Sequence, residues 1–305
     1  MGLFEHIRKL FGQGASASQQ PRFGVEELAR RLGMSVEHLR SIRPAYHEFT
    51  IPKRSGGLRS IHAPDQKLKA AQRAILRRLL SRLRVHTAAC GFERGRSIVT
   101  NALPHVKQAL ILRMDIKDYF QATRVERISN YFRALGWDKE AAELLLNLCT
   151  HKGGLPQGAP TSPRLSNLVN FLLDARLDSA ARKYGAVYTR YADDLTFSFS
   201  SDVPEQTHSI IIMTKSVLAA QGYELHTRRK LHVRRRHDCQ QVTGLVVNQR
   251  VQLPRRTRRW LRAVEHHISQ GRDATLTSVQ LEGWRSLQTM IEKQSGGESS
   301  TNRDS

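Results

Sequence analysis

The pattern of hydrophobic and polar positions differs along the chain: some segments are short apolar runs typical of strands, and others have apolar residues at helical spacing. Residues 109–120, ALILRMDIKDYF, are apolar until Asp115, as in a buried strand whose end delivers an acid to a cleft. Residues 187–200, VYTRYADDLTFSFS, favour two strands joined by a turn that carries Asp193 and Asp194. Between these strands, residues 151–185 start as a glycine- and proline-rich loop and then show helical spacing at Leu165, Leu168, Val169, Leu172 and Leu173.

The two ends of the chain have a different composition. Residues 1–11 place apolar side chains on one helical face, which we expect to pack on the body of the protein rather than on a membrane, and a polar, glycine-containing stretch follows. Residues 24–42 indicate two helices joined by a glycine turn, with Ser35 as a cap. That pattern fits a packed helix pair or a DNA-reading helix-turn-helix. We therefore expect an N-terminal helical region with a flexible linker over 1–42 and a disordered tail over 294–305.

Composition narrows the class of protein. The 305 residues leave room for about two domains, and 49 lysines and arginines against 27 acids give a net charge of +22. This excess favours a polyanionic partner. The three cysteines form no C-x-x-C pair, which argues against a disulfide framework or a zinc cluster. No apolar stretch approaches the roughly 18 residues that cross a bilayer. We expect a cytoplasmic protein without a membrane partner.

The acids at the strand ends indicate a metal site. The neighbouring carboxylates of Asp193 and Asp194 repel each other in a partly desolvated cleft unless cations neutralise them. Mg²⁺ binds through carboxylates and substrate phosphates, and two ions stabilise both oxygens of a phosphoryl displacement. An ordinary polar turn is the alternative. The flanking strands and the strand-end Asp115 favour metal binding.

The motifs YADD and LPQGAPTSPRLSN, with the strand that ends at Asp115, resemble a reverse transcriptase over about residues 49–290. The resemblance implies an RNA-directed DNA polymerase. It also implies two Mg²⁺ ions, held by Asp115, Asp193, Asp194 and the backbone of Ile116.

The resemblance also implies a nucleotide site. Phe120 matches the aromatic residue that contacts the sugar, Gln157 matches the motif glutamine beside the incoming nucleotide, and Tyr191 is the tyrosine of YADD. The segment FTIPKRSGGLRSIHAP resembles the fingers hairpin of the family, which implies that Lys53 and Arg59 reach the triphosphate.

Two shorter motifs resemble the retron reverse transcriptases. One is an N-A-x-x-H pattern from Asn101 to His105, and the other is the triplet Val242, Thr243 and Gly244. The resemblance assigns these residues to RNA binding, whereas a histidine such as His105, taken alone, is more often an ordinary packed residue. It implies a cognate structured noncoding RNA, priming from the 2′-hydroxyl of an internal guanosine, a branched RNA–DNA product and a role in antiphage defence with a separate effector protein. Group II intron-like and diversity-generating reverse transcriptases, and a noncatalytic RNA-binding scaffold, are the alternatives.

The basic residues cluster near the C-terminus. Residues 228–262 hold 12 lysines and arginines against the single acid Asp238. Two apolar stripes at helical spacing resemble thumb helices that clamp a duplex. One stripe includes Trp260, and the other begins at about Thr275 and includes Val279. We assign RNA binding to Arg255, Arg256, Arg258 and Arg259. The resemblance to reverse transcriptases also implies a residue after GYEL that protonates pyrophosphate, and here this role is left open between Arg229 and Lys230.

We therefore expect an α+β right-hand polymerase with an antiparallel palm sheet and a helical thumb. The expected divisions are fingers at 43–112, a palm at 113–251 with an inserted fingers segment at about 126–160, and a thumb at 252–293.

Overall fold

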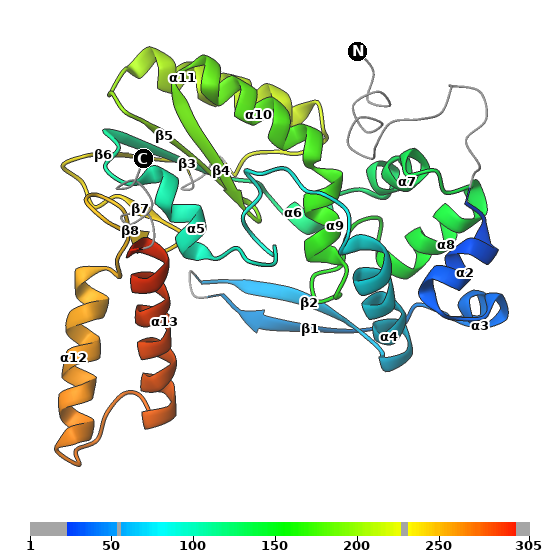
Figure 1. Cartoon of the computed structure of the whole chain (residues 1–305), viewed down its shortest axis with the longest axis horizontal. Coiled ribbons are helices and arrows are strands. Elements are labelled where there is room, and N and C mark those ends of the chain that lie inside the picture. Colours follow the sequence, from blue (N-terminus) through cyan, green and yellow to red (C-terminus); the bar gives the residue numbers. More distant parts are fainter. Residues whose placement is uncertain (1–22, 54–55, 227–230, 297–305) are drawn as a thin grey trace, which may run out of the picture. The chain divides into compact units, whose positions relative to one another are not determined.

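The computed structural model describes residues 23–53, 56–226 and 231–296 (Figure 1). Its contacts divide the chain into two compact units, which interleave along the sequence. The first unit holds Met1–His86, Lys117–Ala175 and Leu218–Glu224, and the second unit holds Thr87–Ile116, Arg176–Val217 and Leu225–Ser305. The predicted helix at 1–11 and its linker lie outside the described residues.

The first unit is mainly helical. Its elements are α2 (Val25–Leu32), α3 (Val36–Ser41), β1 (Tyr46–Pro52), β2 (Leu58–Pro64), α4 (Gln66–Ile75), the π-helical turn η1 (Leu76–Leu80), α6 (Tyr119–Ala122), α7 (Val125–Ala134), α8 (Lys139–Cys149) and α9 (Ser162–Val169). Helix α10 (Phe171–Lys183) starts in this unit and ends in the second unit. Asp65 and Asp138 cap α4 and α8 by accepting backbone N–H bonds of 2.7 and 2.8 Å.

The predicted N-terminal helix pair is confirmed as α2 and α3. Gly33 ends α2 in the left-handed conformation, with φ at 63°, and the Ser35 hydroxyl accepts a bond from the His38 N–H. Leu28 and Leu39 lie in one core with residues of α4, α7, α8 and α9. The pair is therefore part of the core of the first unit and does not form a separate region that ends at residue 42.

The second unit is built on a four-stranded sheet. Strands β3 (Leu110–Asp115), β4 (Ala186–Tyr191), β5 (Asp194–Phe199) and β6 (His232–Arg235) pair in the order β4-β5-β3-β6, and every pair is antiparallel. The other elements are α5 (Ile98–Ala102), the 3₁₀ turn η2 (Leu103–His105), α11 (Pro204–Ala219), β7 (Gln241–Val242), β8 (Leu245–Val246), α12 (Arg255–Ser269) and α13 (Ser278–Gly296). Helix α11 ends in the first unit. The predicted α+β class and antiparallel palm sheet are confirmed.

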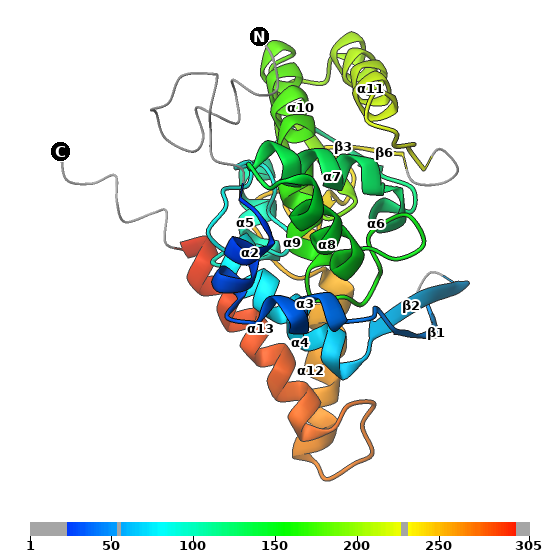
Figure 2. The ribbon, with the colours of Figure 1, turned by 90° about the vertical axis from the view of Figure 1, so that its right-hand side faces the viewer.

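Two long helices, α12 and α13, lie side by side in both views (Figures 1 and 2). Leu261, Val264, Leu281 and Ile291 are buried between them and a core shared with α5 and the β7–β8 pair. The predicted stripe of the second helix is wrong at Val279, which is 83% exposed, because Leu281 faces the core instead. The predicted disordered tail is also wrong at its start, since α13 continues to Gly296.

Among the described residues, no helix has the length and hydropathy of a membrane-crossing segment. The three cysteines are free thiols, and Cys90 and Cys149 are buried.

Replacing Gly154 by alanine should destabilise the first unit. A Cβ at Gly154 would overlap the backbone carbonyl of Gln121, so one of the two segments must shift. We expect the free energy of unfolding to fall by about 1–3 kcal/mol, the range for an overpacked site. Gly283→Ala in α13 is the control, because an added Cβ there meets open space. This substitution should raise stability by up to about 1 kcal/mol. Urea unfolding of the two variants checks both directions, and equal stabilities would contradict the prediction.

Candidate active site

The sheet of the second unit brings the three predicted aspartates to one end. Asp115, the last residue of β3, is the direct cross-strand partner of Asp194, the first residue of β5. Asp193 lies in the turn between β4 and β5, and its backbone carbonyl accepts a 2.9 Å bond from the Ile116 N–H. Residues 79 positions apart in the sequence therefore meet because two antiparallel strands end at the same place.

The turn of the YADD motif is held by backbone contacts and a buried arginine. Ala192 adopts a left-handed conformation with φ at 58°. The fully buried Arg190 donates a 3.1 Å bond from Nη1 to the Ala192 carbonyl. The Ala88 carbonyl accepts from the Arg190 N–H, and the Cys90 N–H donates to the Arg190 carbonyl, both at 2.8 Å. These contacts fix the direction in which the turn presents its acids.

Asp194 forms an ion pair with Arg113. Arg113 Nη2 lies 2.5 Å from Asp194 Oδ2, and Arg113 Nε lies 3.4 Å from Oδ1. Arg113 is two residues before Asp115 on β3, so both side chains lie on the same face of the sheet. Sequence reasoning missed this residue, although an arginine inside the run ALILRMD, in register with the acid, was a usable signal. The guanidinium offsets part of the repulsion among the three carboxylates.

Removing the Arg113 charge should slow catalysis. We expect Arg113→Met to lower the rate of primer extension by roughly 10- to 100-fold, because Asp194 loses the partner that orients it. Arg113→Lys should recover part of the rate, since a lysine keeps the charge but not the two-point contact. Single-turnover extension gives the rate, and a filter-binding assay should show unchanged RNA affinity. A fully active Arg113→Met would contradict this role.

The other predicted nucleotide residues are spread over both units. In the first unit, Lys53 and Arg59 are exposed at the end of the β1–β2 hairpin, and Phe120 and Gln157 are half-buried. The Phe120 carbonyl accepts from the Leu155 N–H at 3.0 Å. In the second unit, the half-buried Tyr191 packs against Phe92, with ring centroids 6.3 Å apart. The nucleotide contacts of all five stay predictions.

The structure corrects the assignment of Asn101, His105 and Val242 to direct RNA contact. Each side chain is at most 1% exposed, so none offers a surface to RNA. His105 Nδ1 lies 2.7 Å from the Ser198 hydroxyl, and Nε2 lies 2.8 Å from the Thr189 hydroxyl. The histidine therefore packs against β4 and β5, the strands that carry the YADD turn.

The triplet that includes Thr243 and Gly244 forms a hairpin turn. Both residues have positive φ, 48° and 82°, and they connect β7 to β8. The Thr243 hydroxyl donates to the Ile98 carbonyl at 3.0 Å, while Gly244 is exposed. Exposure leaves the tip of this turn available for the predicted RNA contact.

The basic face of α12 is exposed. Arg255, Arg256 and Arg259 point to solvent, whereas Arg258 is half-buried and its Nε lacks a hydrogen-bond partner within the described residues. Trp260 and Trp284 pack edge to face, with ring centroids 5.8 Å apart, so the two rings join the helices. Arg229 and Lys230, the candidates for pyrophosphate protonation, lie outside the described residues.

Acid should destabilise the protein through His105. Burial lowers the pKa of His105 to about 3, whereas its usual value is 6.5. Below about pH 6.5 the His105 imidazole therefore binds a proton in the unfolded chain and stays neutral in the folded chain. The free energy of unfolding falls as the pH drops below about 6.5. Between about pH 7 and about pH 5 the wild type should lose roughly 2 kcal/mol more than His105→Gln. Urea unfolding at the two pH values measures the difference, and identical losses would contradict it.

Comparison with known proteins agrees with this geometry. The sequence profile described as "Reverse transcriptase (RNA-dependent DNA polymerase)" matches residues 51–246. The chain belongs to the reverse transcriptase family. It is 38% identical to the retron Mx65 reverse transcriptase of Myxococcus xanthus over 298 residues, which covers 87% of this chain and 69% of that protein. Against the retron Ec86 reverse transcriptase of Escherichia coli the identity is 31%, over 89% of this chain and 85% of that protein.

A further relative, the retron Mx162 reverse transcriptase of Myxococcus xanthus, is 38% identical, but this chain covers only 59% of its length. These similarities place the protein among the retron-type reverse transcriptases. The enzyme is an RNA-directed DNA polymerase, with an RNA template and a DNA product. Reverse transcriptases use divalent metal ions, and the carboxylates of Asp115, Asp193 and Asp194 are the oxygen ligands that such ions prefer.

Proposed function

We propose that this reverse transcriptase copies part of a cognate structured noncoding RNA and primes DNA synthesis from the 2′-hydroxyl of an internal guanosine. The product is then a branched RNA–DNA molecule, and the enzyme acts in antiphage defence together with a separate effector protein. The observation that supports the proposed catalysis is the cross-strand pairing of Asp115 with Asp194 at the YADD turn. Similarity to three retron reverse transcriptases supports the proposed noncoding RNA template and the branched product.

The proposed metal ligands are the three aspartates and the backbone carbonyl of Ile116. Two Mg²⁺ ions bound there would activate the priming hydroxyl and neutralise the departing pyrophosphate. The ion pair with Arg113 keeps Asp194 oriented before a nucleotide arrives. The bond from the Ile116 N–H to the Asp193 carbonyl holds the turn against the end of β3.

The proposed nucleotide contacts follow from residue chemistry. Lys53 and Arg59 supply positive charge for the triphosphate, since both are exposed on the β1–β2 hairpin. The Phe120 ring contacts the sugar and disfavours a 2′-hydroxyl on the incoming nucleotide. Gln157 and Tyr191 contact the incoming nucleotide. In the reaction, the priming oxygen bonds to the α-phosphorus, and the bond from that phosphorus to pyrophosphate breaks.

The proposed RNA surface includes the α12 arginines and the β7–β8 turn with Thr243 and Gly244. No acidic residue is among the nearest sequence neighbours of the exposed arginines, so their charge is available for contacts with phosphate.

The proposed division of the chain follows the right-hand polymerases. In this proposal the thumb is 252–293, the palm is 113–251, and the fingers are 43–112 with the segment at about 126–160.

Sequencing the nucleic acid that copurifies with the enzyme tests the proposed priming. We expect DNA covalently attached to an internal guanosine of one RNA species in the wild type. Asp193→Asn should retain the RNA and lack the DNA, because losing a metal-binding carboxylate stops phosphoryl transfer without changing the basic RNA surface.

Two outcomes would contradict the proposal. DNA primed only from RNA 3′-ends would exclude the 2′-hydroxyl priming and leave the polymerase assignment intact. DNA of equal amount in Asp193→Asn would exclude the metal-binding role of the aspartate.

Neutralising Arg255, Arg256 and Arg259 together should weaken RNA binding and flatten its salt dependence. Each lost phosphate contact lowers the slope of log affinity against log salt by roughly 0.7 to 0.9, so the triple glutamine variant should lose about two units or more. The control replaces three exposed lysines of the first unit, Lys67, Lys69 and Lys139, and removes the same charge. Fluorescence anisotropy over a salt series measures both slopes. An unchanged slope in the arginine variant would remove α12 from the RNA surface.

A further inference from the structure

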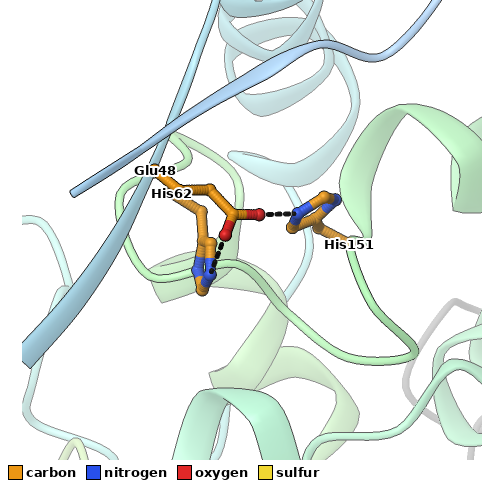
Figure 3. Close-up of side chains that lie close together, drawn as sticks. All are labelled: Glu48, His62 and His151. Atoms are coloured by element: carbon orange, nitrogen blue, oxygen red, sulfur yellow. Dashed lines mark hydrogen bonds and ion pairs between the residues drawn. The ribbon is translucent and has the colours of Figure 1, made fainter.

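A carboxylate and two imidazoles converge in the first unit (Figure 3). Glu48 and His62 are direct cross-strand partners on β1 and β2, so their side chains share one face of the hairpin. His151 follows the C-terminal end of α8. His151 Nε2 lies 2.9 Å from Glu48 Oε1, and His62 Nε2 lies 4.0 Å from Glu48 Oε2.

The spacing of these atoms suits one small metal ion. One ligand atom from each residue lies within 4.8 Å of the other two. Bonds of about 2.0–2.2 Å from a tetrahedral zinc ion place its ligand atoms roughly 3.3–3.6 Å apart. The distance of 2.9 Å between His151 Nε2 and Glu48 Oε1 is shorter than this ligand separation, and the upper limit of 4.8 Å for the three ligand atoms is longer. Small side-chain rotations therefore reach the required geometry. Two imidazoles and one carboxylate form a ligand set that zinc takes in proteins, with water in the fourth position.

His62 has bonding capacity that the protein does not fill. Its Nδ1 is buried without a hydrogen-bond partner in the described part of the chain, and its Nε2 is too far from Glu48 for a hydrogen bond. An imidazole in this state is a ready ligand.

Lys152 competes with a metal ion for the carboxylate. Its ammonium nitrogen lies 2.7 Å from the Glu48 carboxylate. The lysine side chain is 58% exposed, so it leaves the carboxylate for water at little cost. A bound dication would replace this contact.

We propose that Glu48, His62 and His151 bind a zinc ion that joins the β1–β2 hairpin to the loop after α8. The two segments already touch, since the His62 N–H donates a 2.8 Å bond to the Gln157 carbonyl. A Cβ on Gly158 would approach the His62 carbonyl oxygen to 2.9 Å, which shows how tightly the loop packs there. The ion would fasten the strand pair that carries Lys53 and Arg59 to the loop that carries Gln157. Zinc binding does not depend on the proposed priming reaction.

Calorimetric titration of metal-free, full-length protein with Zn²⁺ tests the site. Each of the variants Glu48→Gln and His151→Gln keeps two of the three ligands, and two ligands alone hold zinc poorly. The wild type should therefore bind one more zinc ion per chain than either variant. If a variant still binds zinc at this site, the affinity of the wild type should be at least about 100-fold higher. His47→Gln is the matched control: His47 neighbours Glu48 on β1 but pairs with Ala63 and faces the other side. It should bind zinc as the wild type does. Lys152→Gln should bind more tightly, because the competing ammonium is gone.

Thermal unfolding gives a second readout. Zn²⁺ should raise the melting temperature of the wild type and the His47 variant more than that of Glu48→Gln. Glu48 is 44% exposed, so its variant is expected to fold even if a His62 variant does not. Zinc held at the aspartates would be common to all variants and cancels in the comparison. Equal affinity and stoichiometry in the wild type, Glu48→Gln and His151→Gln would overturn the proposal.

Discussion

Asp115 lies opposite Asp194 because β3 and β5 pair in one register along their whole length, from Leu110 with Phe199 to the two acids. A slip of one residue would turn Asp115 to the other face of the sheet, since strand side chains alternate. Buried apolar residues on β3 and β5, including Leu112 and Phe197, make such a slip costly. The packing of the sheet therefore sets the positions of the carboxylates that we propose as metal ligands.

Positive charge inside the second unit balances that cluster of acids. Arg113 pairs with Asp194 from the same face of β3, and Arg190 is buried under the YADD turn, where it donates to the Ala192 carbonyl. Holding carboxylates close together costs free energy that nearby cations offset. The fixed guanidinium groups offset part of this negative charge, and the divalent metal ions that reverse transcriptases use would offset more of it.

Short motifs identified the family more reliably than they identified contacts. Asn101, His105 and Val242 belong to motifs that resemble those of retron enzymes, yet all three side chains are buried. His105 connects η2 to both strands of the YADD hairpin through two hydroxyl groups. His105 thus supports the site by packing against those two strands, and Gly244 is the exposed residue among the five of these motifs.

The sequence by itself determined the elements whose patterns are local: the strand that ends at Asp115, the YADD hairpin, the β1–β2 hairpin, the capped pair α2–α3 and the helices α12 and α13. Local periodicity and capping chemistry are enough for these. Tertiary structure alone decided which residues meet. The ion pair of Arg113 with Asp194, the burial of His105, the exposure of Val279 and the convergence of Glu48 with His151 all join positions that are distant in sequence or depend on helix rotation. Pairing across such separations is set by the packing of the whole core, which a local pattern does not encode.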